Sequence, residues 1–211
     1  MHTEEINTFI SYLKDYQAEL PLELIDKLTI FASLIHKNNR ALNLVSDHDV
    51  NSLWTRHFLD SLTPFLLGLI NKPADIIDIG SGAGLPGIPL ALLNHQFSVT
   101  MIDSNSKKAR FIERSILELE IDNANIINGR WENINRKFDY CLSRAVFSGF
   151  PPLGKLAQII HSQGKLILFK GKQKPNIEPD EINNAGFLNS EFIILPDKLF
   201  KGKSLLVLTK S

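Results

Sequence analysis

The sequence predicts an α/β fold in which a helical N-terminal extension, residues 1–72, precedes a mostly parallel β-sheet domain, residues 73–211. Three observations lead to it. Apolar residues recur at helical spacing in the first part of the chain. From Asp75 onward, short apolar runs alternate with stretches of helical pattern. The last two runs lie too close together for a helical crossover. We expect the two parts to pack as one compact unit.

The extension is expected to hold four helices. The first two carry apolar residues three or four positions apart, namely Ile6, Phe9, Ile10 and Leu13, then Leu24, Leu28, Phe31 and Ile35. The segment NNRALNLVSD, residues 38–47, is typical of a loop, and Ser46 or Asp47 could cap a third helix. That helix would carry Val50, Leu53, Trp54 and His57, and a fourth would carry Leu62, Phe65, Leu66 and Leu69.

Seven strands are expected in the sheet. Five parallel strands are predicted at 75–79, 98–103, 124–128, 138–143 and 164–170. The runs EFIILP and SLLVLTK, at 191–196 and 204–210, are joined by only seven residues, DKLFKGK, which indicates an antiparallel hairpin.

Composition narrows the possible partners and location. The 23 Lys and Arg balance the 23 Asp and Glu, so a polyanion would have to be met by a local basic patch. The single cysteine, Cys141, excludes an internal disulfide and a thiolate zinc site, so we expect no metal and a reducing cytoplasm. The N-terminus lacks the pattern of a signal peptide and no apolar run could span a membrane, so we expect a cytoplasmic protein. We also expect it to be a monomer.

The stretch DIGSGAGLPG, residues 78–87, is the candidate ligand loop. It places four glycines within eight positions, where a plain turn needs one. Bare backbone allows a ligand to approach closely, and a helix opening near Pro86 would aim N–H groups at it. Asp103 ends the next strand 25 residues after Asp78, a spacing that suits ribose hydroxyls, although Ser104 or Ser106 could cap the following helix.

Two cofactors fit this loop. From Gly82 it matches the dinucleotide pattern G-x-G-x-x-G, and from Asp78 it matches D-x-G-x-G-x-G, which suits S-adenosylmethionine. An acid at Asp78 would repel a pyrophosphate but could hold the ammonium of a methionine moiety. The sequence therefore favours S-adenosylmethionine, with a nicotinamide dehydrogenase as the alternative.

The sequence also narrows the methyl acceptor. Ser143-Arg144-Ala145 ends the fourth strand, where enzymes acting on exocyclic amines have Asn or Asp followed by Pro-Pro, and Cys141 lies inside that strand. A ring nitrogen such as guanine N7 would need no base, although His57 could be proposed as one. No catalytic residue is assigned. The candidate contacts to nucleic acid are Arg56, His57, Arg144, Lys170, Lys172 and Lys174.

Several motifs then occur in order: NLVSDHDVNSLWTRHFLDSL, DIGSGAGLPGIPLA, VTMIDSNSKKARFI, GRWE, FDYCLSRA and FKGK. From about Asn43 to the C-terminus the chain resembles the bacterial family called glucose-inhibited division protein B. The resemblance implies a class I methyltransferase fold with a seven-stranded sheet. It also implies methylation of N7 of a guanine in small-subunit (16S) ribosomal RNA with S-adenosylmethionine. The alternative is a cofactor-gated RNA-binding or ribosome-assembly protein without turnover.

The resemblance also implies site residues. Carried over by position, cofactor contacts fall on Gly80, Leu85, Trp131, Glu132 and Arg144. They add to Asp78 and Gly82 from the loop pattern and to Asp103 at the end of the next strand. Trp131 stands where a smaller residue is common, and Val146-Phe147 replaces Phe-Ala. Arg56, His57 and Asp60 belong to the shared RHFLDS motif, to which we assign no chemical role.

Overall fold

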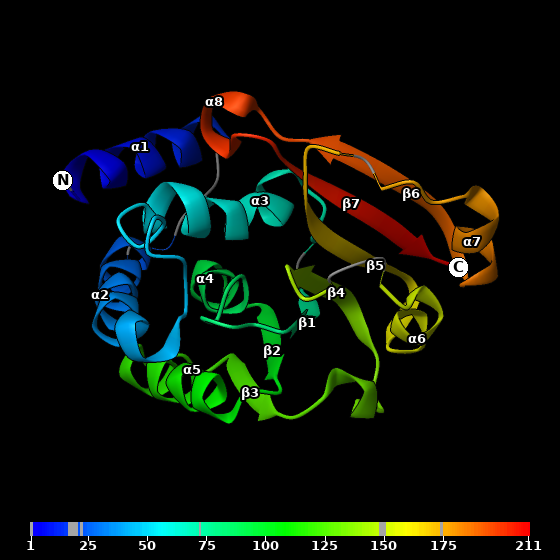
Figure 1. Ribbon diagram of the computed structural model, residues 1–211, viewed down its shortest axis with the longest axis horizontal. Helices are drawn as coiled ribbons and strands as arrows, with labels where there is room; N and C mark the ends of the chain where they lie inside the picture. The colour runs from blue at the N-terminus through cyan, green and yellow to red at the C-terminus, as the bar shows by residue number, and fades with distance from the viewer. Residues whose placement is uncertain (1, 17–20, 22, 72, 148–150, 174) are drawn as a thin grey trace.

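The computed structural model describes residues 2–16, 21, 23–71, 73–147, 151–173 and 175–211. It contains a seven-stranded sheet with the order β3-β2-β1-β4-β5-β7-β6 (Figure 1). The first five strands are parallel, and β7 runs antiparallel to both β5 and β6. The strands are β1 (Ala74–Ile79), β2 (Phe97–Asp103), β3 (Ala124–Asn128), β4 (Phe138–Arg144), β5 (Ile160–Gly171), β6 (Phe187–Ile194) and β7 (Lys203–Lys210). The predicted sheet and hairpin are confirmed.

The helices flank this sheet. They are α1 (His2–Asp15), α2 (Leu24–Leu42), α3 (Leu59–Leu66), α4 (Gly87–Leu93), α5 (Ser106–Glu118), α6 (Leu153–Gln158), α7 (Pro179–Asn184) and α8 (Asp197–Phe200). The opening of α4 after Pro86 is as predicted. Among the described residues, no helix is long and apolar enough to cross a membrane.

The predicted loop over 38–47 is wrong in its first half, because α2 continues to Leu42. Asn39 is buried in the last turn, and its side-chain oxygen accepts the N–H groups of Leu44 and Val45, both at 2.9 Å. Asn43 adopts a left-handed conformation that ends the helix. The buried Asn39 side chain therefore binds the backbone that follows α2 and helps to end the helix from within the core.

The predicted third and fourth helices form one continuous helical run that begins at Leu53. A π-helical turn, Trp54–Phe58, leads directly into α3. Ser46 and Asp47 do not cap it, since the Ser46 hydroxyl instead donates to Asp49 at 2.8 Å within a preceding turn. Segments of π-helix are rare and frequently mark functional sites, and this turn carries the first three residues of the RHFLDS motif, Arg56, His57 and Phe58.

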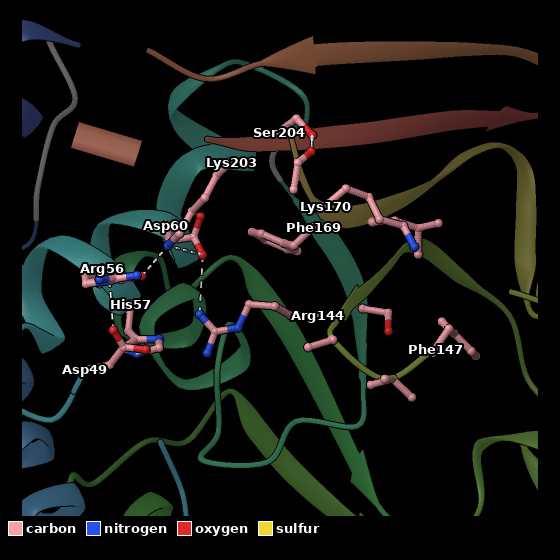
Figure 2. Close-up of a pocket in the computed structure, with 15 residues that line it drawn as sticks. Asp49, Arg56, His57, Asp60, Arg144, Phe147, Phe169, Lys170, Lys203 and Ser204 are labelled. Atoms are coloured by element: carbon pink, nitrogen blue, oxygen red, sulfur yellow. Dashed lines mark hydrogen bonds and ion pairs between the residues drawn. The ribbon is translucent and has the colours of Figure 1, made fainter. Parts of the chain in front are cut away.

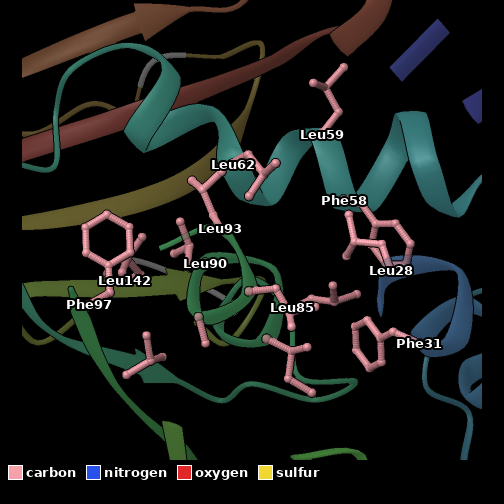
Figure 3. Close-up of a cluster of buried hydrophobic side chains, with 14 of the residues drawn as sticks. Leu28, Phe31, Phe58, Leu59, Leu62, Leu85, Leu90, Leu93, Phe97 and Leu142 are labelled. Atoms are coloured by element: carbon pink, nitrogen blue, oxygen red, sulfur yellow. The ribbon is translucent and has the colours of Figure 1, made fainter. Parts of the chain in front are cut away.

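The helical extension and the sheet share one apolar core. Phe31 of α2 stacks on Phe58 with ring centroids 5.7 Å apart, and both belong to a buried cluster with Leu85 and with Leu142 of β4 (Figure 3). This packing joins the two parts of the chain. Residue 72, where the sequence places their boundary, lies outside the described residues, so the division stays a prediction.

Helix α5 is capped by Asn105 and not by Ser104 or Ser106, which corrects the sequence prediction. The Asn105 side-chain oxygen accepts the N–H groups of Lys107 at 3.0 Å and Lys108 at 3.3 Å. Asn105→Ala is expected to lower the free energy of unfolding by about 1 kcal/mol, because two amide donors lose their acceptor. Urea unfolding measures this, and Ser104→Ala and Ser106→Ala serve as controls. Equal losses in all three variants would contradict the assignment.

Candidate functional site

The candidate site lies at the carboxyl ends of the central strands. From β1 the chain passes to β2 and β3 on one side, and then returns to β4 on the other side of β1. Ligands of open α/β sheets bind where the strand order reverses in this way. The loops after β1, β2, β3 and β4 therefore form the candidate ligand-binding site.

The glycine loop after β1 depends on left-handed backbone. Gly80, Gly82 and Gly84 have φ of +67°, +58° and +82°. A Cβ at Gly80 would collide with the side chain of Val146, whereas a Cβ at Gly82 would meet only the Gly80 carbonyl oxygen, at 3.9 Å. The loop is thus closed by Val146 over Gly80 and open at Gly82.

Asp103 holds this loop against the end of β2. Its two carboxylate oxygens accept the N–H groups of Gly82 and Asn105, each at 2.8 Å. A carboxylate has roughly four acceptor sites, so two remain for ligand hydroxyls. Asp103 also lines a cavity of about 260 Å³, together with Gly80, Trp131 and Glu132. Four of the predicted cofactor residues are therefore brought together in one cavity.

The other four predicted cofactor residues, Asp78, Gly82, Leu85 and Arg144, do not line that cavity. Gly82 is hydrogen-bonded to Asp103, and Arg144 lines a second cavity, so direct contact of these two with a cofactor stays a prediction. The side chain of Leu85 is buried in the apolar core, and its N–H group donates to the Ser81 carbonyl at 3.0 Å. Asp78 is fully buried beneath the loop, where one oxygen accepts the Gly87 N–H at 3.0 Å. Burial raises the pKa of Asp78 to about 6. Direct contact of either residue with a cofactor stays a prediction.

A second cavity of about 490 Å³ adjoins the first. Val146 lines both cavities, and Trp131 in the first packs edge-on against Phe147 in the second, with ring centroids 6.2 Å apart. The second cavity gathers four of the six candidate contacts to nucleic acid, namely Arg56, His57, Arg144 and Lys170 (Figure 2).

Of the two remaining predicted contacts to nucleic acid, the structure describes only Lys172. Lys172 does not line this cavity, because its ammonium pairs with Asp197 at 2.9 Å. Lys174 lies outside the described residues.

Cys141 is fully buried, and burial raises the pKa of its thiol far above the ordinary value, as expected for a structural cysteine.

Sequence reasoning missed how the second cavity is held together. Asp60 is only 3% exposed, and its Oδ2 lies 3.0 Å from Lys203 Nζ and 3.4 Å from Arg144 Nη1. The Lys203 ammonium also donates to the Arg56 carbonyl. The available signal was a lone acid within the apolar helical pattern of residues 53–66. Lys203 gave no such signal in the sequence, since a lysine just before a predicted strand is common.

Asp49 forms a second anchor at the rim of the cavity. Its carboxylate lies 2.9 Å from Arg56 Nε and 3.7 Å from His57 Nε2 (Figure 2). Although burial raises the pKa of Asp49, the Ser46 hydroxyl and the Arg56 guanidinium outweigh it, and the pKa lies below its usual value. Asp49 is thus ionised at neutral pH and fixes the direction of Arg56.

His57 is a neutral imidazole in this surrounding. Burial lowers its pKa to about 3, and the cations Arg144 and Lys203 act in the same direction. Neither ring nitrogen has a hydrogen-bond partner among the described residues. His57 therefore carries no charge at pH 7.

His57→Gln is expected to make the protein more resistant to acid. Between pH 6.5 and about 5, unfolded His57 binds a proton that folded His57 refuses, so the wild type loses up to about 1.4 kcal/mol per pH unit as pH falls. Asp78 acts oppositely, because its raised pKa favours the folded state as pH falls from about 6 to 3.8. Urea unfolding at several pH values should show the stability of H57Q relative to wild type rising toward pH 5. A constant difference would contradict the buried neutral histidine.

With the geometry in place, the chain can be compared with known proteins. The family model described as rRNA small subunit methyltransferase G, GidB, matches residues 24–190. The protein of that name from Rickettsia rickettsii is 38% identical over 154 residues, which cover 73% of this chain and 78% of that protein. The one from Oenococcus oeni is 36% identical over 154 residues, covering 68% of this chain and 64% of that protein, just under two thirds of its length.

Solved structures give the fold. A methyltransferase from Aquifex aeolicus, described as dependent on S-adenosylmethionine, superposes with a TM-score of 0.60 at 15% identity, covering 85% of this chain and 98% of that one. Magnesium protoporphyrin IX methyltransferase from Synechocystis, solved with bound S-adenosylmethionine, gives 0.59 at 16% identity, covering 86% and 97%. The predicted class I methyltransferase fold is confirmed. Together with the match over residues 24–190, the relatives show that this chain belongs to the rRNA small subunit methyltransferase G family.

Proposed function

We propose that this protein transfers the methyl group of S-adenosylmethionine to N7 of a guanine in 16S ribosomal RNA. The observation that carries the proposal is the pair of adjoining cavities in a member of this family. One cavity is lined by the glycine loop and carboxylates, the other by basic and aromatic side chains, and Val146 lies between them. We further propose that the protein acts in the cytoplasm as a monomer.

The side chains that line the first cavity suit the hydroxyl groups and the aromatic ring of the cofactor. Asp103 keeps acceptor sites for ribose hydroxyls, and Trp131 and Glu132 offer an aromatic face and a carboxylate. The backbone at Gly82 leaves the approach open. Beneath it, Asp78 Oδ1 is buried and has no partner among the described residues. When bound, S-adenosylmethionine supplies a methyl group activated by a positively charged sulfur.

The second cavity suits a purine and its phosphates. Phe147 and Phe169 line it and could stack on a base splayed out of an RNA loop. Arg56, Arg144 and Lys170 could contact phosphate oxygens and fix the orientation of the chain. The work left to the protein is positioning, which can contribute roughly 7 to 11 kcal/mol. Guanine N7 gives up no proton, so the neutral His57 is not needed as a base.

Methyl transfer from isotopically labelled S-adenosylmethionine to small-subunit RNA tests the proposal. Mass mapping of nucleosides should find 7-methylguanine at one site in RNA treated with the protein and none in untreated RNA. Binding of cofactor and RNA without product would favour the alternative, a cofactor-gated assembly protein. Quenching or enhancement of NADH fluorescence on adding the protein would instead favour a nicotinamide enzyme.

A further inference from the structure

A third concave surface lies outside the two cavities described above, between helices α2 and α5. This groove has a volume of about 400 Å³. Four exposed basic residues line it, Lys37 from α2 and Lys107, Arg110 and Arg114 from α5. Leu34 and Phe111 contribute apolar surface to the same groove. The proposed methyl transfer uses the other two cavities and not this groove.

The charge of the groove is unbalanced. None of the four basic side chains forms an ion pair with an acid of the described residues, and Glu118 is the only acid that lines the groove. The chain as a whole has a formal charge of zero. The positive charge here is therefore a local concentration that the groove's own acids do not neutralise. Such a patch attracts a polyanion.

The basic side chains of α5 form a row. Lys107, Arg110 and Arg114 are spaced i, i+3 and i+7, so they share one face of the helix over about 10 Å of its axis. Two of them are arginines, whose planar fork matches phosphate oxygens bidentately. A row of this kind follows a repeating phosphate chain better than it follows a single carboxylate.

The groove also begins beside the cofactor cavity. Ser104 lines that cavity, and α5 starts two residues later, so Lys107 lies in the first turn beyond it. A strand of RNA lying along α5 would thus pass next to the methyl donor. This placement favours the RNA that carries the target base over an unrelated polyanion.

We propose that the groove between α2 and α5 binds the phosphate backbone of the ribosomal RNA substrate, at nucleotides flanking the methylated base. The inference rests on the proposed function and adds a second contact surface to it. Arg110 and Arg114 are positioning residues here, since they touch neither the cofactor cavity nor the purine cavity.

The double variant Arg110→Gln with Arg114→Gln tests the proposal in the full-length protein. The KM for naked small-subunit RNA should rise about tenfold, while kcat at saturating RNA and the affinity for S-adenosylmethionine stay unchanged. The slope of log(kcat/KM) against log of salt concentration should become shallower by about two, since two phosphate contacts are lost. The matched control is Lys14→Gln with Lys155→Gln, which removes two exposed charges from α1 and α6. It should change neither the KM for RNA nor the salt slope.

Several outcomes would overturn the proposal. An unchanged KM and salt slope in the groove variant, or equal changes in the control, would show that the groove does not hold RNA. A defect on whole subunits that is absent on naked RNA would assign the groove to a protein partner. Should wild type methylate no RNA, the proposed function fails separately. Fluorescence anisotropy of a labelled RNA fragment at two salt concentrations, with the same variants, then still decides whether the groove binds phosphates.

Discussion

Gly82→Leu is expected to abolish binding of S-adenosylmethionine while leaving the protein folded. An added Cβ at Gly82 would meet only the Gly80 carbonyl oxygen, at 3.9 Å, so the backbone there is open, and we expect a leucine to fill space that the cofactor needs. We expect the affinity to fall more than about 100-fold, equivalent to roughly 2.8 kcal/mol. The cost to folding is the left-handed backbone at φ +58°, about 1–2 kcal/mol. Isothermal titration with the cofactor and urea unfolding measure the two effects.

Gly68→Leu is the matched control. Gly68 has φ of +66°, and an added Cβ there would meet nothing within 4 Å, but it follows α3 and lies outside the glycine loop. Both variants should lose similar stability, and only the Gly82 variant should lose the cofactor. If Gly82→Leu still binds S-adenosylmethionine at the wild-type affinity, the cofactor does not pass over this part of the loop.

Parts of the fold were predictable where one physical rule decides the structure. The central strands β1 and β4 are mostly apolar because both of their faces are covered, and each was predicted to within one residue of its observed bounds. The edge strand β6 was found only in its second half, because Leu188, Asn189 and Ser190 in its first half are exposed and interrupt the apolar run. Their pairing with β7 is set by the neighbouring strand, which local composition does not reveal.

The candidate site was likewise predictable only where one local rule decides the structure. The glycine loop and Asp103 could be found because backbone freedom and chain spacing leave a pattern in the sequence. The anchor at Asp60 could not, because its partners Arg144 and Lys203 are 84 and 143 positions away, as their residue numbers show. The misplaced cap of α5 has a local cause: Ser104, Asn105 and Ser106 are all good capping residues, and only the backbone conformation selects one.

Asp60→Asn is expected to destabilise the protein and to damage methyl transfer together. The carboxylate faces two cations, and its loss would leave Arg144 and Lys203 close to each other without a counter-charge. Breaking a buried pair costs roughly 3–5 kcal/mol. Because both cations are partly exposed, we expect about 2–3 kcal/mol in urea unfolding. The kcat should fall as well, since Arg144 would lose its fixed position at the cavity.

Two comparisons separate this network from a general effect of charge. Glu23→Gln removes an equally negative side chain that pairs with Lys27 but is itself exposed, and it should cost no more than about 0.5 kcal/mol. Adding Lys203→Met to Asp60→Asn removes the uncompensated ammonium, and it should recover part of the lost stability because the two sites are in direct contact. Recovery of stability without recovery of kcat would mean that Lys203 itself serves the reaction. Strictly additive losses, with Lys203→Met also measured alone, would show that Asp60 does not hold Lys203.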